Sequence, residues 1–489
     1  MEEEHRLVSE RIRKLDEIKT AGVNPYPYSF EQKQHATDVL EKNKSLKPEQ
    51  HATENISVAG RIMTLRRMGK ASFLHIQDQT GKLQLYFREE DVGKEQYEIF
   101  RKVDLGDIIG AEGHVFATKT GEVTVYVKKF ELLAKSLRPL PEKYHGLQDI
   151  ELKYRERYLD LIMNPDSRKV FTDRTRIISS IRAFLEKKGY LEFETPTLQP
   201  VYGGAHAKPF ETVHNELKTK LYLRISNELY LKRLLVGGFE KVFEFVKDFR
   251  NEGIDKTHNP EFTMLEFYCA YIDYNEIMDI TEKLLKQASK EATGKTSVEY
   301  QGTTIDFSKK FERITMIDAI KKHAKIDVTK LSEEEIKGLV DENHVEYRGK
   351  FSMGLGIELL FEALVQKHLV QPTFVIDHPK ESTPLCKESR NDPELIERLE
   401  LFIAGMEIAN GYSELNDPIK QRMLLEGQAK ERSEGDEEAN PMDEDFVKAL
   451  EYAMPPAGGI GIGIDRFVMI LTNQPSIRDV ILFPTLKPK

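Results

Sequence analysis

Tryptophan is absent from this chain of 489 residues, and cysteine occurs only at Cys269 and Cys386. Two isolated cysteines provide neither a disulfide framework nor the spacing of a zinc site. We therefore interpret both as packing residues and expect a reducing compartment, the cytoplasm.

Long apolar runs are also missing. No stretch approaches the roughly 20 apolar residues that a membrane-spanning helix needs, so we expect no membrane partner. The N-terminal residues MEEEHRLVSERIRK lack the apolar segment of a secretory signal. Hydrophobic residues make up 39% of the chain and charged residues 31%, which favours a packed core over disorder. The net charge of −10 argues only mildly against a nucleic-acid partner, because phosphate binding needs only a local basic patch.

The hydrophobic pattern divides the chain into parts. Residues 1–55 contain apolar residues at helical spacing and predict a helical extension. Residues 56–137 alternate with period two between short polar turns, which predicts a five-stranded β-barrel with the OB-fold as the leading candidate. The Pro-rich stretch RPLPEKYHG opens a linker, residues 138–165.

The remaining residues, 166–489, mix helices with strands and predict an α+β fold: an antiparallel sheet flanked by helices. A helical insertion is expected around 275–370. The stretch LELFIAGMEIANGYSEL reads as a hairpin that turns near Ala404 and Gly405.

The stretch FRNEGIDKTHNPEFTMLEFY, residues 249–268, joins two alternating segments through a polar loop. The planar fork of Arg250 suits a phosphate or a carboxylate. His258 would add a donor for a polyphosphate, and Phe262 would stack on a base. The alternative is an exposed hairpin with a structural pair between Arg250 and Glu266.

The glycine-rich stretch GIGIGIDR, residues 459–466, lets a backbone approach a ligand closely. Its G-x-G-x-G spacing lacks a βαβ context, and the chain has no P-loop motif, so neither common parallel-sheet nucleotide site is present. Arg466 would be a second phosphate ligand, or it pairs with a surface acid beside a packing strand.

Two further groups suggest ligands. Glu400 and Glu407 on the facing strands of the expected hairpin are hard ligands of the kind that bind Mg²⁺ with phosphates. Basic residues near Arg66, together with Phe73, suit single-stranded nucleic acid on a barrel face, although Phe73 is equally compatible with the core.

Together these stretches resemble a class II lysyl-tRNA synthetase over nearly the whole chain. GYLEFETPTLQP, FRNEG…HNPEFTMLEFY and GGIGIGIDR resemble the three class II motifs, and neither HIGH nor KMSKS of class I occurs. YGGAHAKPF, NELYLKR, RYLDLI and EIANGYSELND resemble the lysine-specific members. GRIMTLRRMGKASFLHIQD resembles their anticodon-binding barrel.

The resemblance implies a role for each matching residue. Arg250 and Arg466 would be catalytic. The ATP-binding residues would be Arg250, Glu252, His258, Asn259, Phe262, Glu407 and Arg466. The lysine-binding residues would be Gly204, Glu228, Glu266, Tyr268, Asn410, Tyr412 and Glu414. The Mg²⁺ ligands would be Glu400 and Glu407, and the anticodon readers Arg66, Phe73, Gln84 and Glu122. One departure is visible, because Ser226-Asn227 replaces the usual Ala-Pro before Glu228.

The implied function is ATP-dependent ligation of L-lysine to tRNA(Lys) through a lysyl adenylate, with release of AMP and pyrophosphate, by a homodimer. One alternative is a lysyl transferase that modifies a protein, but such relatives lack the barrel expected over 56–133. A second is a non-catalytic tRNA-binding paralogue, against which Arg250, Glu407 and Arg466 argue.

Overall fold

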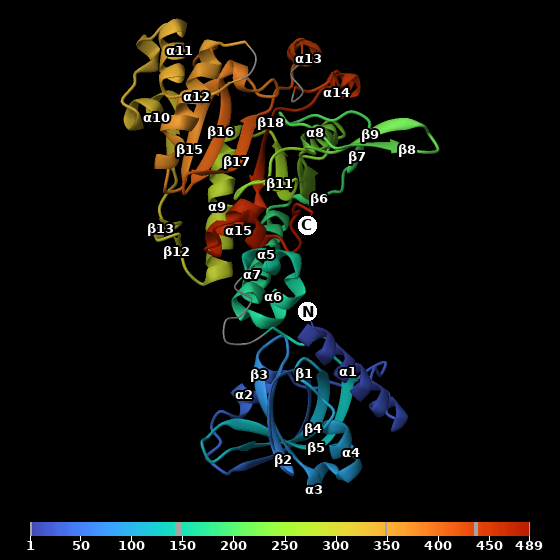
Figure 1. The fold of residues 1–489 in the computed structure, drawn as a ribbon. Helices are drawn as coiled ribbons and strands as arrows, with labels where there is room; N and C mark the ends of the chain where they lie inside the picture. The colour runs from blue at the N-terminus through green and yellow to red at the C-terminus, as the bar shows by residue number, and fades with distance from the viewer. Residues whose placement is uncertain (1, 142–148, 348–349, 435–438, 489) are drawn as a thin grey trace. The chain divides into compact units, whose positions relative to one another are not determined.

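A computed structural model describes residues 2–141, 149–347, 350–434 and 439–488. The chain divides into two compact units, Met1–Gly146 and Leu147–Lys489 (Figure 1). No helix in the described ranges is both long enough and apolar enough to cross a membrane.

The first unit is a closed barrel with the strand order β1-β2-β3-β5-β4. Its strands are β1 (His51–Met68), β2 (Ala71–Gln77), β3 (Lys82–Arg88), β4 (Ile108–Ala117) and β5 (Val123–Ala134). Side chains alternate across the barrel wall, so that Leu74 and Ile76 of β2 point into the core while Phe73 is only half-buried. The predicted five-stranded OB-fold barrel is confirmed.

Helices cover parts of this barrel. α1 (Glu2–Thr20) and α2 (Ala36–Asn43) lie in the predicted N-terminal extension, and Ile18, Ala36 and Val39 pack into the barrel core. α3 (Glu89–Val92) and α4 (Lys94–Phe100) follow β3, where sequence reasoning expected no helix. Phe100 of α4 stacks on Phe87 at 4.1 Å between ring centroids, which joins this helix to the core.

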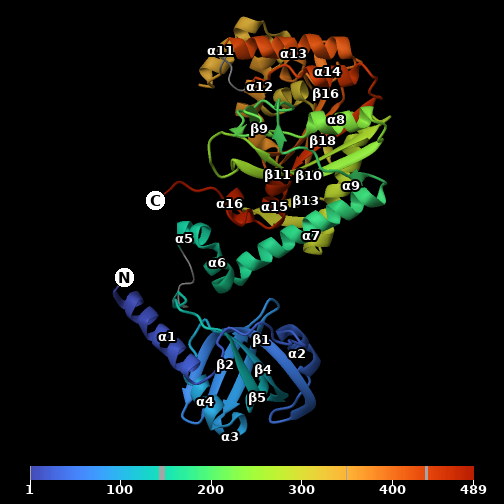
Figure 2. The same cartoon turned by 90° about the vertical axis from the view of Figure 1, so that its right-hand side faces the viewer.

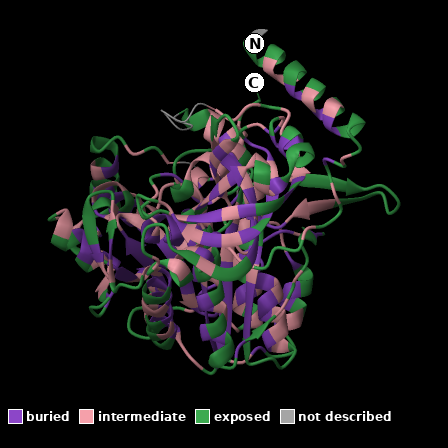
Figure 3. Cartoon of the chain, turned by 90° about the horizontal axis from the view of Figure 1, so that it is seen from below, coloured by how far each residue is buried: buried purple, intermediate pink, exposed green. Residues whose placement is uncertain are grey.

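The second unit is built on an eight-stranded sheet with the order β14-β15-β16-β17-β18-β11-β10-β6. Its strands are β6 (Leu191–Glu192), β10 (Lys241–Phe249), β11 (Glu261–Ala270), β14 (Glu312–Thr315), β15 (Thr373–Pro379), β16 (Leu395–Ile403), β17 (Met406–Ser413) and β18 (Ala457–Gly463). The pairs from β15 to β10 are antiparallel, which confirms the predicted sheet. Buried residues run along its strands (Figure 3).

Helices flank both sides of the sheet (Figure 2). α7 (Pro165–Lys187), α9 (Tyr274–Thr293) and α15 (Ile464–Leu471) share one apolar core with the central strands. α8 (Glu228–Val236) packs on β10 and β11 within a separate cluster that includes α14 (Glu444–Leu450). α10 (Met316–His323), α11 (Glu333–Glu342) and α12 (Met353–Leu364) form a third cluster beside β15.

Residues 275–370 are less uniformly helical than expected. They contain β12 (Ser297–Tyr300), β13 (Thr303–Asp306) and β14, and β14 extends the main sheet in parallel with β15. Each of these strands has four residues. A segment this short gives too few alternations to reveal a period of two.

The range expected as a linker, 138–165, includes residues that lie outside the described ranges and also α5 (Ile150–Arg155) and α6 (Arg157–Met163). The Tyr154 hydroxyl donates to Asp479 at 2.9 Å, and Arg157 donates to the carbonyl of Leu482 at 2.9 Å. These contacts attach both helices to the second unit. The remaining strands and α-helices are β7 (Leu198–Gln199), β8 (Glu211–His214), β9 (Thr219–Leu223), α13 (Pro418–Ser433) and α16 (Ile477–Val480).

Candidate active site

A cavity of about 540 Å³ opens over β11, β17 and β18 in the second unit. The predicted ATP-, metal- and lysine-binding residues line it with one exception, and they come from segments more than 250 residues apart in sequence: Gly204, Glu228, Arg250, Glu252, His258, Asn259, Phe262, Glu266, Tyr268, Glu400, Glu407, Asn410, Tyr412 and Arg466. The exception is Glu414, which lies behind the wall. The fold therefore gathers residues that the sequence pattern suggested only separately.

The hairpin of β10 and β11 positions Arg250. This residue follows the last residue of β10, and its backbone N–H donates to the carbonyl of Pro260 at 2.9 Å. Its guanidinium lies 5.1 Å from the centroid of the Phe262 ring, and Nε has no partner among the described residues. The alternative pair with Glu266 does not form, because the register places Glu244 opposite Glu266. Arg250 thus keeps donors for a ligand.

Arg466 connects three of the predicted residues. It lies in the first turn of α15, and its Nη1 donates to the backbone carbonyl of Glu407 at 2.8 Å. Its Nη2 lies 2.9 Å from Nε2 of His258. Asp255 holds the other side of that imidazole, with 2.8 Å between Oδ2 and Nδ1. The loop after β10 and the start of α15 therefore converge on one cationic end of the cavity.

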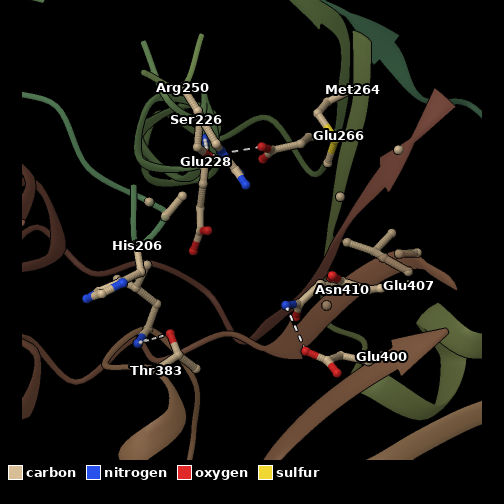
Figure 4. Close-up of a pocket in the computed structure, with 18 of the residues that line it drawn as sticks. His206, Ser226, Glu228, Arg250, Met264, Glu266, Thr383, Glu400, Glu407 and Asn410 are labelled. Carbon is tan, nitrogen blue, oxygen red and sulfur yellow. Dashed lines mark hydrogen bonds between the residues drawn. The ribbon is translucent and has the colours of Figure 1, made fainter. Parts of the chain in front are cut away.

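Two acids face the middle of the cavity. Burial, followed by repulsion from Glu400, raises the pKa of Glu407 above its ordinary value. Asn410 donates to Glu400 at 3.4 Å (Figure 4), and Arg398 lies 2.5 Å from the same carboxylate. The sequence pattern did not single out Arg398, because a lone arginine within a strand has no motif around it.

This acid pair is compatible with Mg²⁺. Among the described residues, no group of three or more metal-ligating side chains gathers at one point. Mg²⁺ commonly binds through one or two carboxylates, water and substrate phosphates, so it does not require a complete protein cage. The raised pKa of Glu407 beside Glu400 is the effect that a bound cation would relieve.

The far end of the cavity carries the predicted lysine ligands. Ser226 donates to Oε1 of Glu266 at 3.0 Å (Figure 4). The Tyr268 hydroxyl donates to Oε2 of the same carboxylate at 2.8 Å. Burial and the nearby Asp248 and Glu228 carboxylates raise the pKa of Glu266 well above its ordinary value. A cationic ligand would offset this accumulation of negative charge.

Lys232 is a functional candidate that sequence reasoning missed. Its ammonium lies 2.5 Å from Oε1 of Glu228 and 2.5 Å from Oε2 of Glu414. Glu414 lies behind Gly459, where a side-chain carbon would overlap both Tyr268 and the Glu414 carboxylate. Oε1 of Glu414 has no hydrogen-bond donor among the described residues. That orphaned acceptor points to a missing donor.

The departure at Ser226-Asn227 preserves the start of α8. The hydroxyl of Ser226 accepts the backbone N–H of Glu228 at 3.0 Å. Asn227 occupies the N-cap position without a side-chain cap and instead donates to Glu244 at 2.6 Å. Of these two side chains, Ser226 is therefore the one that binds a backbone N–H of the helix.

In the first unit, the predicted anticodon readers lie near an aromatic surface. Arg66 pairs with Phe73 across β1 and β2, and the Phe73 ring lies 4.5 Å from that of Tyr86. Because Phe73 is half-buried, the core interpretation is not supported. Gln84 donates to Glu122 at 2.7 Å. Aromatic rings beside hydrogen-bonding side chains can stack and read exposed bases.

Comparison with known proteins identifies the family. Residues 149–487 match the family model described as tRNA synthetases class II (D, K and N), and residues 56–133 match that of the OB-fold nucleic acid binding domain. The lysine–tRNA ligase of Pelotomaculum thermopropionicum is 52% identical, across 100% of this chain and 96% of that protein. Those of Methanoculleus marisnigri and Staphylococcus aureus MRSA252 are 52% and 48% identical, each across 98% of this chain and across 94% and 98% of the relative. This chain belongs to the lysine–tRNA ligases, within the class II tRNA synthetases.

Proposed function

We propose that the cavity joins L-lysine to ATP as lysyl adenylate and then transfers the lysyl group to tRNA(Lys). A lysine carboxylate oxygen attacks the α-phosphorus, a new O–P bond forms, and the bond to pyrophosphate breaks. The carboxylate is already ionised, so no general base is needed. The tRNA terminal hydroxyl then attacks the lysyl carbonyl and releases AMP. The observation that carries this proposal is one cavity with arginines at one end and buried carboxylates at the other.

The arginine end suits the triphosphate. Arg250 would contact the α-phosphate and the lysine carboxylate, because its guanidinium borders the cavity with Nε unpaired. Phe262 and Arg466 would enclose the adenine, with Glu252 and Asn259 beside it. His258 and Arg466 would reach the outer phosphates. Fixed cations at a transferring phosphoryl group stabilise charge in the transition state.

The carboxylate end suits the two ammonium groups of lysine. Gly204 and Glu228 would hold the α-amino group. Glu266, Tyr268 and Glu414 would hold the ε-ammonium, and Asn410 and Tyr412 would complete the wall. Gly204 has φ +89, and a side chain there would approach the Ser226 hydroxyl at 2.8 Å. A glycine at this position keeps the entrance beside Glu228 open.

Mg²⁺ entering with ATP would be held by Glu400 and Glu407, and it would supply charge neutralisation at the phosphates.

In the first unit, Arg66, Phe73, Gln84 and Glu122 would read the tRNA anticodon. Cytoplasmic location is supported by the two cysteines, which are both free and buried.

We also propose a homodimer formed through the region of β6. This strand ends the eight-stranded sheet, and its Leu191 is 53% exposed; Leu198 of β7, in the three-stranded sheet that follows in sequence, is 48% exposed. An uncovered strand edge with apolar side chains favours association with a second chain. Analytical ultracentrifugation should give a dimer at working concentrations, and a fully active monomer would contradict the proposal.

Lysine-dependent exchange of pyrophosphate into ATP tests the catalytic assignment. Arg250→Ala should reduce the exchange rate by about 10²-fold or more, the scale for removing one preorganised charge stabiliser. Circular dichroism would verify that the variant folds. Unchanged exchange kinetics in a folded Arg250→Ala protein would remove this residue from the mechanism.

A further inference from the structure

The Ser226 hydroxyl joins the backbone of Glu228 to the carboxylate of Glu266, and both residues border the lysine end of the cavity. It accepts the backbone N–H of Glu228 at 3.0 Å and donates to Oε1 of Glu266 at 3.0 Å (Figure 4). Ser226 also lines the cavity and is only 5% exposed. One hydroxyl therefore connects the first turn of α8 to a side chain of β11.

Two hydroxyls from different elements hold the Glu266 carboxylate. Ser226 donates to one oxygen and Tyr268 to the other, at 3.0 and 2.8 Å. An ionised carboxylate has about four lone-pair positions, so two remain for a substrate. Because the donors act on opposite oxygens, they fix the rotation of the carboxylate without using up its capacity as an acceptor.

The neighbouring Glu244 provides a contrast. It pairs with Glu266 across the two strands but does not line the cavity. Its oxygens accept from Thr195 at 2.7 Å, Asn227 at 2.6 Å and Arg224 at 3.1 Å. Glu244 is thus enclosed by protein donors, whereas Glu266 keeps acceptor positions directed at the cavity.

We propose that Ser226 is a positioning residue for lysine, which acts by orienting the Glu266 carboxylate toward the substrate ammonium. This inference rests on the proposed assignment of Glu266 to the lysine end of the cavity. Without the hydroxyl, Oε1 of Glu266 would lose the one hydrogen-bond donor that it has among the described residues, and the carboxylate would be free to rotate away from the substrate.

Electrostatics provides a readout for this role. The charged or titratable groups that face Glu266 come from β10, α8, β11, the end of β17 and the loop after β10: Asp248, Glu244, Glu228, Lys232, Tyr268, Glu414 and Arg250. The strand β18 presents Gly461 at this register and adds no charge. Burial, Asp248 and Glu228 raise the pKa of Glu266, whereas the hydrogen bonds from Tyr268 and Ser226 lower it. Removing the Ser226 hydroxyl should therefore leave less ionised Glu266 at neutral pH.

The test is Ser226→Ala in the full chain, which removes a single buried oxygen. Pyrophosphate exchange would be measured between pH 6.5 and 8.5, with lysine and ATP varied separately. The lysine KM should rise by about tenfold at pH 7, the scale for a hydrogen bond to a charged group. As the pH rises, the lysine KM of Ser226→Ala should fall toward the parent value, and this fall should occur at a higher pH than the corresponding fall in the parent. The ATP KM of the variant should stay within about twofold of the parent value.

Thr195→Val is the matched control. It removes a hydroxyl that donates to Glu244 at 2.7 Å, on the carboxylate paired with Glu266 across the sheet. This change should leave the lysine KM and its pH dependence unaltered. If Thr195→Val changes the lysine KM as much as Ser226→Ala does, the effect is a general loosening of the sheet and the proposal is wrong.

A folded Ser226→Ala protein with the parent lysine KM at every pH would overturn the inference. So would an ATP KM that rises in step with the lysine KM. If Ser226→Ala does not fold, Ser226→Cys can replace it, because cysteine keeps the shape with a weaker donor. A parent-like lysine KM at every pH, or an ATP KM that rises with the lysine KM, would overturn the inference for this variant as well. If the parent shows no lysine-dependent exchange at all, the proposed function fails. If the parent does exchange pyrophosphate in a lysine-dependent reaction and Ser226→Ala has the same lysine KM, the role of Ser226 fails while the proposed function stands.

Discussion

Lys232 explains how several carboxylates can face one small cavity. Burial opposes its charge, but Glu228 and Glu414 raise the pKa of Lys232 above its ordinary value, so it stays cationic. The sequence predicted the acids but not this cation. A glutamate and a lysine four residues apart on a helix are common on exposed surfaces, and only the fold shows that this pair is buried.

Glu414→Gln should raise the lysine KM by about 10²-fold or more. Breaking a buried ion pair costs roughly 3–5 kcal/mol, and at pH 8.5, where Glu414 is ionised, the substitution keeps the shape while removing the charge that faces Lys232. The ATP KM should change much less, because Glu414 lies behind the cavity wall and contacts Lys232 rather than the arginine end. Exchange kinetics with circular dichroism as a folding control would measure both. A lysine KM within a few-fold of the parent would exclude Glu414 as a ligand.

Lysine binding should improve as the pH rises from 6.5 to 8.5. Burial raises the pKa of Glu414 to about 8, although Lys232 opposes the shift. A raised pKa means that the carboxyl group keeps its proton through neutral pH and ionises only near pH 8. The ionised form is the better acceptor for an ammonium, so the lysine KM should fall by about tenfold over this range. The change should be smaller in Glu414→Gln, and a lysine KM that rises with pH would contradict the assignment.

Among the elements, long alternating segments were predictable and short ones were not. The hairpin of β16 and β17 turns at Ala404 and Gly405 as predicted, and both have positive φ, as a two-residue hairpin turn requires. The register of β10 and β11 was not predictable, because apolar residues occur along both strands and the sequence pattern is compatible with more than one pairing. Only the structure places Glu244, rather than a cation, opposite Glu266.

Gly459→Ala tests the glycine-rich strand β18. Gly459 faces Tyr268 on β11 and Tyr412 on β17, and an added side-chain carbon would overlap the Tyr268 ring and the Glu414 carboxylate. We expect a loss of about 1–3 kcal/mol in unfolding free energy from overpacking, together with a higher lysine KM.

Gly463→Ala is the control on the same strand. Its added carbon would meet the carbonyl of Ile408 at 3.6 Å, an ordinary contact. Denaturant titration of both variants should therefore separate them. Equal stability of the two proteins would show that the close packing around Gly459 is not required.

At the scale of the molecule, each of the two units has its own apolar core. The Pro-rich break and the change from period two to mixed patterns predicted this division. The helices α5 and α6 were not predicted, because their attachment depends on hydrogen bonds to residues near the C-terminus, more than 300 positions away.

A fragment of residues 149–489 should keep lysine-dependent pyrophosphate exchange but charge tRNA poorly. All residues of the cavity lie in that fragment, whereas the barrel would supply the anticodon contacts and part of the attraction to phosphates. Exchange and aminoacylation would be compared with the full chain. A fragment that charges tRNA as well as the full chain would show that the barrel has another role.

Glu244 and Glu266 face each other across β10 and β11, so we expect this hairpin to form during folding only after other segments have docked against it. Like charges directly opposite each other destabilise a strand pair, and both acids are ionised in an unfolded chain at neutral pH. Tyr268, which donates to Glu266, lies within the hairpin, but the other donors Thr195, Arg224, Ser226 and Asn227 precede it in sequence. We expect amides of β10 and β11 to gain protection only when residues 195–227 dock, which pulsed hydrogen exchange during refolding would detect. Early protection of the hairpin alone would contradict this order.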